Sequence, residues 1–302
     1  MQKMNNQLKG TLSLFGATLI WGSAFIAQSM GMDLIGPFTF QFFRCGAAVV
    51  FLILVCFLKD VRIGGIREFK TRWMNRRLWK AGFICGCALF VSASLQQIGL
   101  VYTDAGKAGF ITAMYIVLVP ILGLFLKRKP PRSTLFSLVL AVAGLYLLSC
   151  VGVTRINTGD LFIIGSAFAY AVQITCIDHF AGDCDGLRLN CIQGFVVTVI
   201  SIPFMFGLET IDMGNIIACA MPIGYAGILS MGVAYTLQIV GQRHVEPTTA
   251  SLIMSMESVI AALCGWLLLH ERMTGSELLG CCLVFSAVLI SQIPQKDNKK
   301  HD

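Results

Sequence analysis

Two charged side chains lie inside long apolar stretches, where a charge is expensive to bury. Glu257 stands in the stretch 248–268, and Arg44 stands in the stretch 36–58. If these stretches cross a lipid bilayer, each charge costs several kcal/mol unless it is paired or hydrated, so each is a candidate functional residue. The Glu257 carboxyl, near the middle of its stretch, is suited to binding a cationic group or to carrying a coupling proton.

Both charges also have a structural interpretation. The Glu257 carboxyl can accept a hydrogen bond from Ser255, from Ser258 or from another helix without any role in function. The Arg44 guanidinium is suited to a substrate carboxylate. An arginine in such a place is more often tied to backbone carbonyls or to an acid on a neighbouring helix. The residue types alone leave these alternatives open.

The chain contains one long stretch twice, and polar residues repeat with it. Displacing 82–149 by 142 positions aligns it with 224–291 without a gap, with 14 identities in 68 pairs. Three glycines coincide, and Gln96 falls on Gln238. Chance agreement between two apolar stretches explains shared leucine and valine, but it does not easily explain glycines and a glutamine at one offset. A true internal repeat is the better interpretation, and repeats decide the fold.

Membrane-spanning helices must position these residues. Of the 302 residues, 56% are hydrophobic and only 13% are charged, whereas an average soluble domain has about 25% charged residues. Runs of about 18 or more residues with almost no charge predict spanning helices. The sequence predicts ten of them, at 10–29, 36–58, 81–102, 107–126, 133–151, 160–180, 190–207, 221–241, 248–268 and 277–293.

The connection 59–80 is long and carries eight of the Lys and Arg residues. Within it Ile66, Phe69 and Trp73 fall at i, i+3 and i+7, a spacing that favours a short helix on the membrane surface with its basic face outward. A solvated basic loop is the alternative interpretation.

Lys and Arg are unevenly divided between the two sides that ten spans define. The side with both termini has 19 of the 23 basic residues, the other side has three, and Arg44 lies within a helix. Because basic loops favour the cytoplasm, we expect the short tails 1–9 and 295–302 to be cytoplasmic. The net charge of +7 then reflects these loops and gives no reason to expect a nucleic-acid partner.

The repeat gives the predicted helices a mechanical meaning. Each half holds five helices, an odd number, so the second half must cross the membrane in the opposite sense to the first. Inverted repeats are frequent in secondary transporters, where rocking one half on the other opens a central site to either side. The expected fold is an all-α polytopic membrane protein, with inverted five-helix repeats at 11–150 and 158–294 around a central cavity.

Two motifs carry a family resemblance. Residues 18–25, which include Trp21-Gly22-Ser23, and residues 256–274, which run from Met256-Glu257 to Met273-Thr274, resemble the first and last signatures of EamA-type transporters. These belong to the drug/metabolite transporter superfamily, and the resemblance covers the whole chain. Two departures are visible: Ser258 stands where the family commonly has proline, and His270 stands where it commonly has glycine.

The resemblance implies a function and a set of site residues. The family moves small metabolites, often amino acids or amphiphilic compounds, without nucleotide hydrolysis, and its helices 1, 3, 4, 6, 8 and 9 surround the cavity. On this chain the implied substrate-binding candidates are Trp21, Gln96, Tyr115, Gln173, Gln238 and Glu257. For each residue alone, ordinary helix packing is the alternative. The motifs identify the transport machinery but not its cargo.

The sequence therefore predicts a secondary-active exporter in the plasma or inner cell membrane. Its partners would be a small-molecule substrate and the lipid bilayer, with the proton as a candidate coupling ion. No cofactor is expected, and the protein would act as a monomer or a homodimer. The twelve cysteines form no metal-type pattern and are interpreted as small buried hydrophobes.

Two other classes of protein are the alternatives. A polytopic membrane enzyme would need a clustered catalytic or metal site near one interface, but Asp183 and Asp185 are isolated and the four histidines show no metal spacing. We therefore expect no catalytic residue and no metal. A receptor or scaffold would not require inverted symmetry, and solute flux in proteoliposomes separates both classes from a carrier.

Overall fold

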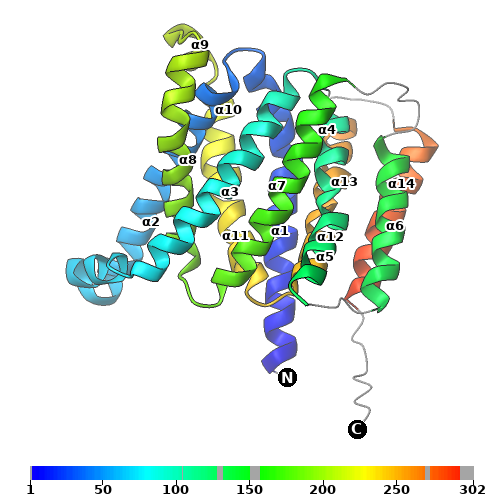
Figure 1. Cartoon of the computed structure of the whole chain (residues 1–302), viewed down its shortest axis with the longest axis horizontal. Coiled ribbons are helices and arrows are strands. Elements are labelled where there is room, and N and C mark those ends of the chain that lie inside the picture. Colours follow the sequence, from blue (N-terminus) through cyan, green and yellow to red (C-terminus); the bar gives the residue numbers. More distant parts are fainter. Residues whose placement is uncertain (1, 104, 128–131, 150–156, 269–272, 293–302) are drawn as a thin grey trace.

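The computed structural model describes residues 2–103, 105–127, 132–149, 157–268 and 273–292, and every element in that part of the chain is a helix (Figure 1). Eight of these helices are long and apolar enough to cross a membrane. Two further apolar helices, at Ser133–Leu148 and Gly275–Ser291, are shorter. The chain is thus a polytopic membrane protein, while the count of ten spans stays a prediction.

The helices of each half follow one another with short connections. The first half forms α1 (Gln2–Met32), α2 (Pro37–Trp73), α3 (Arg76–Leu100), α4 (Ala105–Ala113), α5 (Tyr115–Phe125) and α6 (Arg132–Ser149). The second half forms α7 (Thr158–Ala181), α8 (Gly186–Leu208), α9 (Met213–Ala218), α10 (Ala220–Gly224), the π-helix η1 (Tyr225–Ala234), α11 (Tyr235–Gln242), α12 (Pro247–Met254), α13 (Met256–Leu268) and α14 (Gly275–Ser291).

Three of the predicted helices are interrupted. The range 107–126 is divided at Met114, and the range 248–268 is divided at Ser255. At each interruption the backbone tightens, because Val117 N–H bonds to Met114 O and Ser258 N–H bonds to Ser255 O, three residues back. The range 221–241 contains the wider turns of η1. Such changes of helix type are frequent at functional sites.

Helix boundaries recur at the offset found in the sequence. The helices α3 and α11 end 142 residues apart, at Leu100 and Gln242, and α4 and α12 begin 142 residues apart, at Ala105 and Pro247. The interruptions at Met114 and Ser255 are separated by 141 residues, one fewer. These helix boundaries are thus spaced as the sequence repeat is, while the inverted arrangement of the two halves stays a prediction.

Helices of the two halves pack against each other rather than forming separate bodies. In Figure 1 the pair α6 and α14 lies at one edge of the molecule, and the pair α2 and α8 lies at the opposite edge. Between them α3 packs on α7, and α1 packs on α13. Gly144 and Gly280 let α6 and α14 touch, because a Cβ atom on Gly144 would lie 2.8 Å from the Gly280 oxygen. The core is consequently shared between the halves.

The helix α2 is tied to α8 at two places. At its first turn the Glu209 carboxylate, just after α8, accepts the N–H groups of Phe38 and Thr39 at 2.7 Å each. Just before Gly64, where α2 leaves helical geometry, the fully buried Asp60 is ion-paired with Arg188 of α8, which is 1% exposed. These polar contacts hold α2 and α8 together as one unit.

We call residues 59–80 the elbow, because α2 changes direction there. Gly64 and Gly65 leave helical geometry, and Gly65 has a φ of +71°, which favours glycine. The chain then returns to helix up to Trp73 and turns into α3, leaving the elbow at the side of the molecule (Figure 1). The segment is helical, as the spacing of Ile66, Phe69 and Trp73 predicted, and is not an irregular loop.

Candidate functional site

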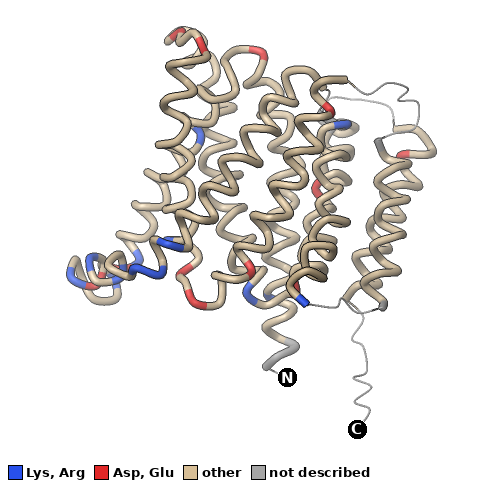
Figure 2. Tube along the Cα trace, in the orientation of Figure 1, with Lys and Arg blue, Asp and Glu red and all other residues tan. Residues whose placement is uncertain are grey.

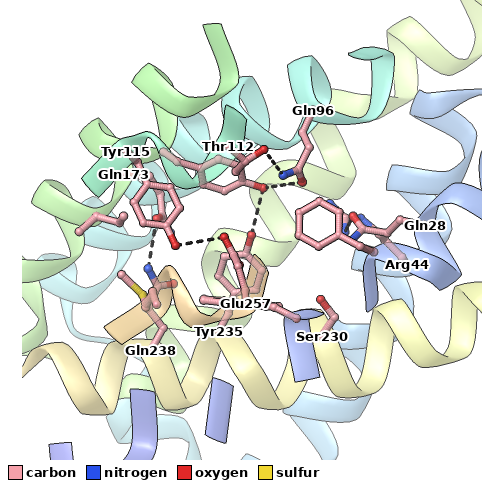
Figure 3. A pocket seen from close by; sticks show the side chains of 15 residues that line it. Gln28, Arg44, Gln96, Thr112, Tyr115, Gln173, Ser230, Tyr235, Gln238 and Glu257 are labelled. Atoms are coloured by element: carbon pink, nitrogen blue, oxygen red, sulfur yellow. Dashed lines mark hydrogen bonds between the residues drawn. The ribbon is translucent and has the colours of Figure 1, made fainter. Parts of the chain in front are cut away.

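A cavity lies at the centre of the molecule, and both halves of the chain line it (Figure 3). Its walls come from α1, α2, α3, α4, α5, α7, η1, α11, α12 and α13. The seven residues that the sequence singled out all line it: Trp21, Arg44, Gln96, Tyr115, Gln173, Gln238 and Glu257. The open space is about 40 Å³, which is room for a few water molecules only.

Glu257 and Tyr115 meet in this cavity. The Tyr115 hydroxyl donates a hydrogen bond to Glu257 Oε1 at 3.0 Å, and both side chains are about 5% exposed or less. The two residues are 142 positions apart, so they are repeat mates that meet between the two halves. The Ser255 and Ser258 hydroxyls donate instead to backbone carbonyls. Of the interpretations made from the sequence, the contact with another helix is the one present.

Gly22 brings α1 close to α13 beside this carboxylate. A Cβ atom on Gly22 would lie 2.6 Å from Ile260 Cβ and 2.8 Å from the Glu257 backbone oxygen, so only glycine fits. The neighbouring Trp21 is directed into the cavity, with its ring edge-on to Tyr235 at 5.0 Å. The Trp21 indole N–H has no hydrogen-bond partner among the residues that the structure describes. It is a donor available to a ligand.

Arg44 is 2% exposed and lies beside Gln28 in the wall of the cavity (Figure 3). Its Nε and Nη2 donate to Gln41 Oε1 at 3.1 and 2.7 Å, and its Nη1 donates to Gln28 Oε1 at 3.1 Å. In the described part of the chain its hydrogen-bond partners are thus these amide side chains, rather than the acid or the backbone carbonyls expected as partners for a structural role. A guanidinium has five N–H donors, three of which bond to these amides, and the Cys45 side chain also interacts with the guanidinium.

Uncharged polar side chains form a hydrogen-bonded chain across the cavity. Tyr235 donates to Tyr170 at 3.4 Å, Tyr170 donates to Gln96 Oε1 at 3.2 Å, and Gln96 Nε2 donates to Thr112 at 3.1 Å (Figure 3). This chain runs through α11, α7, α3 and α4, so it joins the two halves.

The repeat mates Gln96 and Gln238 line the same cavity but do not bond to each other. Gln238 Nε2 donates instead to Gln173 Oε1 at 3.4 Å. Within the described part of the chain, this leaves Gln238 Oε1 and Gln173 Nε2 buried without a hydrogen-bond partner. The pair therefore offers one acceptor and one donor to a polar ligand.

Sequence reasoning missed four polar residues of the cavity, namely Gln28, Tyr170, Ser230 and Tyr235. A second offset could have revealed Tyr170. Displacing the start of the chain by 149 positions aligns Gly10 and Gly16 with Gly159 and Gly165 and places Trp21 on Tyr170. For Gln28 and Ser230 no comparable signal is present.

Some charged side chains outside the cavity are paired at the ends of helices, and Asp185 is an example. Asp185 caps α8 and lies 3.5 Å from Lys59 and 3.1 Å from Arg188. Burial raises the pKa of Asp185, but the Arg188 backbone N–H and the charges of Lys59 and Arg188 outweigh it and hold the pKa below its usual value. In the described residues no three His, Cys, Asp or Glu side chains form a group that could hold a metal ion.

The apolar helices and the shared polar cavity define a multi-pass integral membrane protein. The model of the EamA-like transporter family matches this chain twice, at residues 8–150 and 157–292. The chain therefore belongs to the EamA-like transporter family.

Relatives agree with this assignment over nearly the whole chain. An uncharacterized transporter of Archaeoglobus fulgidus is 30% identical, over 94% of this chain and 86% of its own. The threonine/homoserine exporter RhtA of Escherichia coli (strain K12) is 25% identical, over 99% of this chain and 96% of its own. A solved crystal structure at 16% identity shares the fold, with a TM-score of 0.75 over 94% of this chain and 96% of that one.

Proposed function

We propose that this protein is a secondary transporter of the cell membrane that exports small zwitterionic metabolites, with amino acids as the model cargo. One observation carries the proposal: Arg44 and Glu257 are both buried in one cavity, and neither has an ionic partner in the described part of the chain. A buried charge without a partner is costly. A zwitterion supplies a partner to both charges at once.

Arg44 and Glu257 would bind the two charged ends of the cargo. The N–H groups of Arg44 that are not bonded to Gln41 and Gln28 bind the carboxylate. Glu257 binds the ammonium group, which displaces the Tyr115 hydroxyl. The unpartnered atoms of Gln173, Gln238 and Trp21 are left for a polar side chain on the cargo. The relative named as a threonine/homoserine exporter has cargo of this chemistry.

Alternating access would move the cargo. The two halves, each with five spans, cross the membrane in opposite senses and rock about the cavity, with both termini in the cytoplasm. A space of about 40 Å³ must widen to admit an amino acid, so the cross-cavity hydrogen bonds break when cargo enters. Glu257 holds a proton when it does not hold an ammonium group, which couples outward cargo movement to inward proton movement.

The test is exchange of labelled amino acids in proteoliposomes that contain the full-length protein. An unlabelled free amino acid should compete with the labelled one for exchange. Its methyl ester should compete more weakly because it has no carboxylate for Arg44 to bind. Its N-acetyl derivative should also compete more weakly, because it has no ammonium group for Glu257 to bind. Arg44→Gln should abolish exchange of the free acid and leave the weak competition by the ester unchanged. Glu257→Gln should abolish uptake driven by a pH gradient.

Glu277→Gln is the matched control. Glu277 lies outside the cavity in the capping box of α14, where glutamine also caps, so its exchange should equal that of the wild type. Wild-type exchange in both cavity variants would overturn the proposal. Flux of lipophilic cations that requires Glu257 but not Arg44 would replace the zwitterion with an amphiphilic cation as cargo.

A further inference from the structure

We propose that the elbow, together with the neighbouring face of α8, is a binding site for an anionic phospholipid of the cytoplasmic leaflet. The site would take the phosphate-bearing headgroup on the cations of the elbow and one acyl chain in an apolar groove beneath them. It lies outside the central cavity and is independent of the cargo. The position in the cytoplasmic leaflet follows from the orientation proposed above.

The elbow has far more cations than acids to pair with them. It holds eight Lys and Arg residues but only Asp60 and Glu68 as acids (Figure 2). Three of the cations pair with acids, as Lys59–Asp185, Arg72–Glu68 and Arg77–Asp183. The other five are exposed and have no ionic partner in the described part of the chain: Arg62, Arg67, Lys70, Arg76 and Lys80.

An apolar groove of about 330 Å³ opens beside these cations. Its wall consists of side chains from α2, the elbow, the start of α3 and α8, namely Val49, Ile53, Phe69, Trp73, Trp79, Cys191, Ile192 and Phe195. Ile53 is 44% exposed, Trp79 is 45% exposed and Phe195 is 47% exposed. Because the groove runs down a face of spanning helices, its natural contents are hydrocarbon chains.

Two helix faces join the cations to the groove. In the helical end of the elbow, Lys70 shares one face with Trp73, three residues further on. At the start of α3, Arg76, Trp79 and Lys80 stand at i, i+3 and i+4 and share one face. Lys70, Arg76 and Lys80 therefore stand next to the aromatic side chains that line the groove.

This arrangement matches the chemistry of an anionic lipid. Trp residues at the end of a span lie at headgroup level in a bilayer, and clusters of Lys and Arg beside a span attract anionic headgroups. Basic loops also serve to orient a membrane protein. That role alone requires neither a groove nor aromatic side chains beneath the cations, and it does not distinguish Arg76 from Arg62.

The experiment is native mass spectrometry of the detergent-purified full-length protein with dioleoyl phosphatidylglycerol or dioleoyl phosphatidylethanolamine. The acyl chains are identical, so any difference belongs to the headgroup. We expect one phosphatidylglycerol to be retained at least tenfold better than phosphatidylethanolamine. Dihexanoyl phosphatidylglycerol and inorganic phosphate have the anion without a long chain, and both should be retained poorly if the groove holds the chain.

Two variants of equal charge locate the site. Arg76→Gln with Lys80→Gln should weaken retention about fivefold for each cation removed. The matched control, Arg62→Gln with Arg67→Gln, removes the same charge from the same segment but away from the groove, and its retention should change by less than about twofold. Ile53→Trp, at an exposed position that faces lipid, should fill the groove and lower retention of the long-chain lipid only.

If the two charge variants lost phosphatidylglycerol retention equally, the proposed site would be overturned, because the lipid would then respond only to the total charge of the elbow. Equal retention of both headgroups would overturn the claim for an anionic lipid. If Arg76→Gln with Lys80→Gln does not yield folded protein, the wild-type comparison of headgroups and chain lengths still decides the proposal. None of these outcomes touches the cargo site, because amino-acid exchange is measured separately with the cavity variants.

Discussion

Tyr115 and Glu257 hold the same place in the two repeats but differ in chemistry. One is neutral and the other is acidic, and the Tyr115 hydroxyl donates to the Glu257 carboxyl across the cavity. A duplicated site would begin with two like groups at this point, and two acids so close together would repel each other. The observed pair places a single carboxyl group, that of Glu257, in the cavity, and the Tyr115 hydroxyl donates a hydrogen bond to it.

Replacing Tyr115 with phenylalanine should have opposite effects on the empty and the loaded protein. The empty protein loses a buried hydrogen bond and leaves Glu257 without a partner, which costs about 1–3 kcal/mol of stability. The loaded protein no longer has to break that bond, so a zwitterion should bind up to tenfold more tightly. Thermal shift measurements with and without an amino acid give both quantities.

Tyr170→Phe is the comparison for this prediction. Its hydroxyl bonds to Gln96 and not to Glu257, so the variant should melt at a lower temperature without any gain in ligand-induced stabilisation. The same response in both tyrosine variants would contradict the competition between Tyr115 and the ammonium group.

Asp185 should make the protein sensitive to acid. Because its pKa in the folded protein is held below the usual value by the Arg188 N–H, Lys59 and Arg188, its stabilising effect is complete above the unfolded pKa of about 3.9. That effect is lost as the pH falls through the lower, folded pKa. The melting temperature should therefore fall steeply below about pH 4.

Asp185→Asn isolates this effect, because asparagine still caps a helix but has no charge. Its melting temperature should be lower near pH 7 and should depend less on acid than that of the wild type. Asp33→Asn, at an exposed acid without an ion pair in the described residues, should follow the wild-type curve. If the melting temperature of Asp185→Asn fell at low pH as that of the wild type does, other carboxyl groups would be responsible for the acid sensitivity.

The charged residues of the cavity could be picked out from the sequence because charge inside an apolar stretch is rare and costly. The amides Gln96 and Gln238 could be found because they repeat. Gln28 and Tyr235 could not, because an isolated amide or phenol costs little in a helix packed against others. The partners of Arg44 also required the structure, since only the fold shows that amides and not acids surround it.

At the scale of the element, hydrophobicity located the helices because apolar length is what a bilayer selects. It did not locate the interruptions at Met114 and Ser255 or the π-helix η1. No proline or glycine stands at Met114 or Ser255, so the local sequence has no helix-breaking residue that would predict these tightened turns. The repeat could have predicted that two interruptions occur together, but not where.

Gly22→Ala should loosen the contact between α1 and α13. An added Cβ would lie 2.6 Å from Ile260 Cβ, and overpacking of this kind costs about 1–3 kcal/mol. Gly224→Ala is the matched control, because its Cβ would meet nothing within 4 Å and alanine is the better helix former. Thermal melting should show a loss for Gly22→Ala and no loss for Gly224→Ala. If the two variants had the same melting temperature, the helices α1 and α13 would be able to shift apart enough to accommodate the added methyl group.

At the scale of the whole molecule, the ties between α2 and α8 limit which parts can move separately. Glu209 binds the first turn of α2, and the Asp60–Arg188 pair binds α2 just before its kink at Gly64, so we expect these two helices from different halves to move together. In the proposed transport cycle, the hydrogen bonds between tyrosine and amide groups across the cavity would be the ones that break. The moving bodies would then differ from the two sequence halves, because α2 and α8 would stay in one of them.

The predicted orientation can be tested directly. Fusion of green fluorescent protein after residue 183 should fluoresce, and alkaline phosphatase at the same place should be inactive, because that connection lies on the side rich in Lys and Arg. Phosphatase fused after residue 33 or residue 210 should be active. Active phosphatase after residue 183 would reverse the orientation and would place the elbow in the opposite leaflet.

The small central space also bears on the membrane potential. A space of about 40 Å³ holds only a few water molecules, so a continuous file of water has no room to form at this level. Protons cross a bilayer readily along such files. In this conformation we therefore expect an idle copy to conduct few protons, and a pH-sensitive dye inside proteoliposomes that contain the protein without cargo would measure that leak.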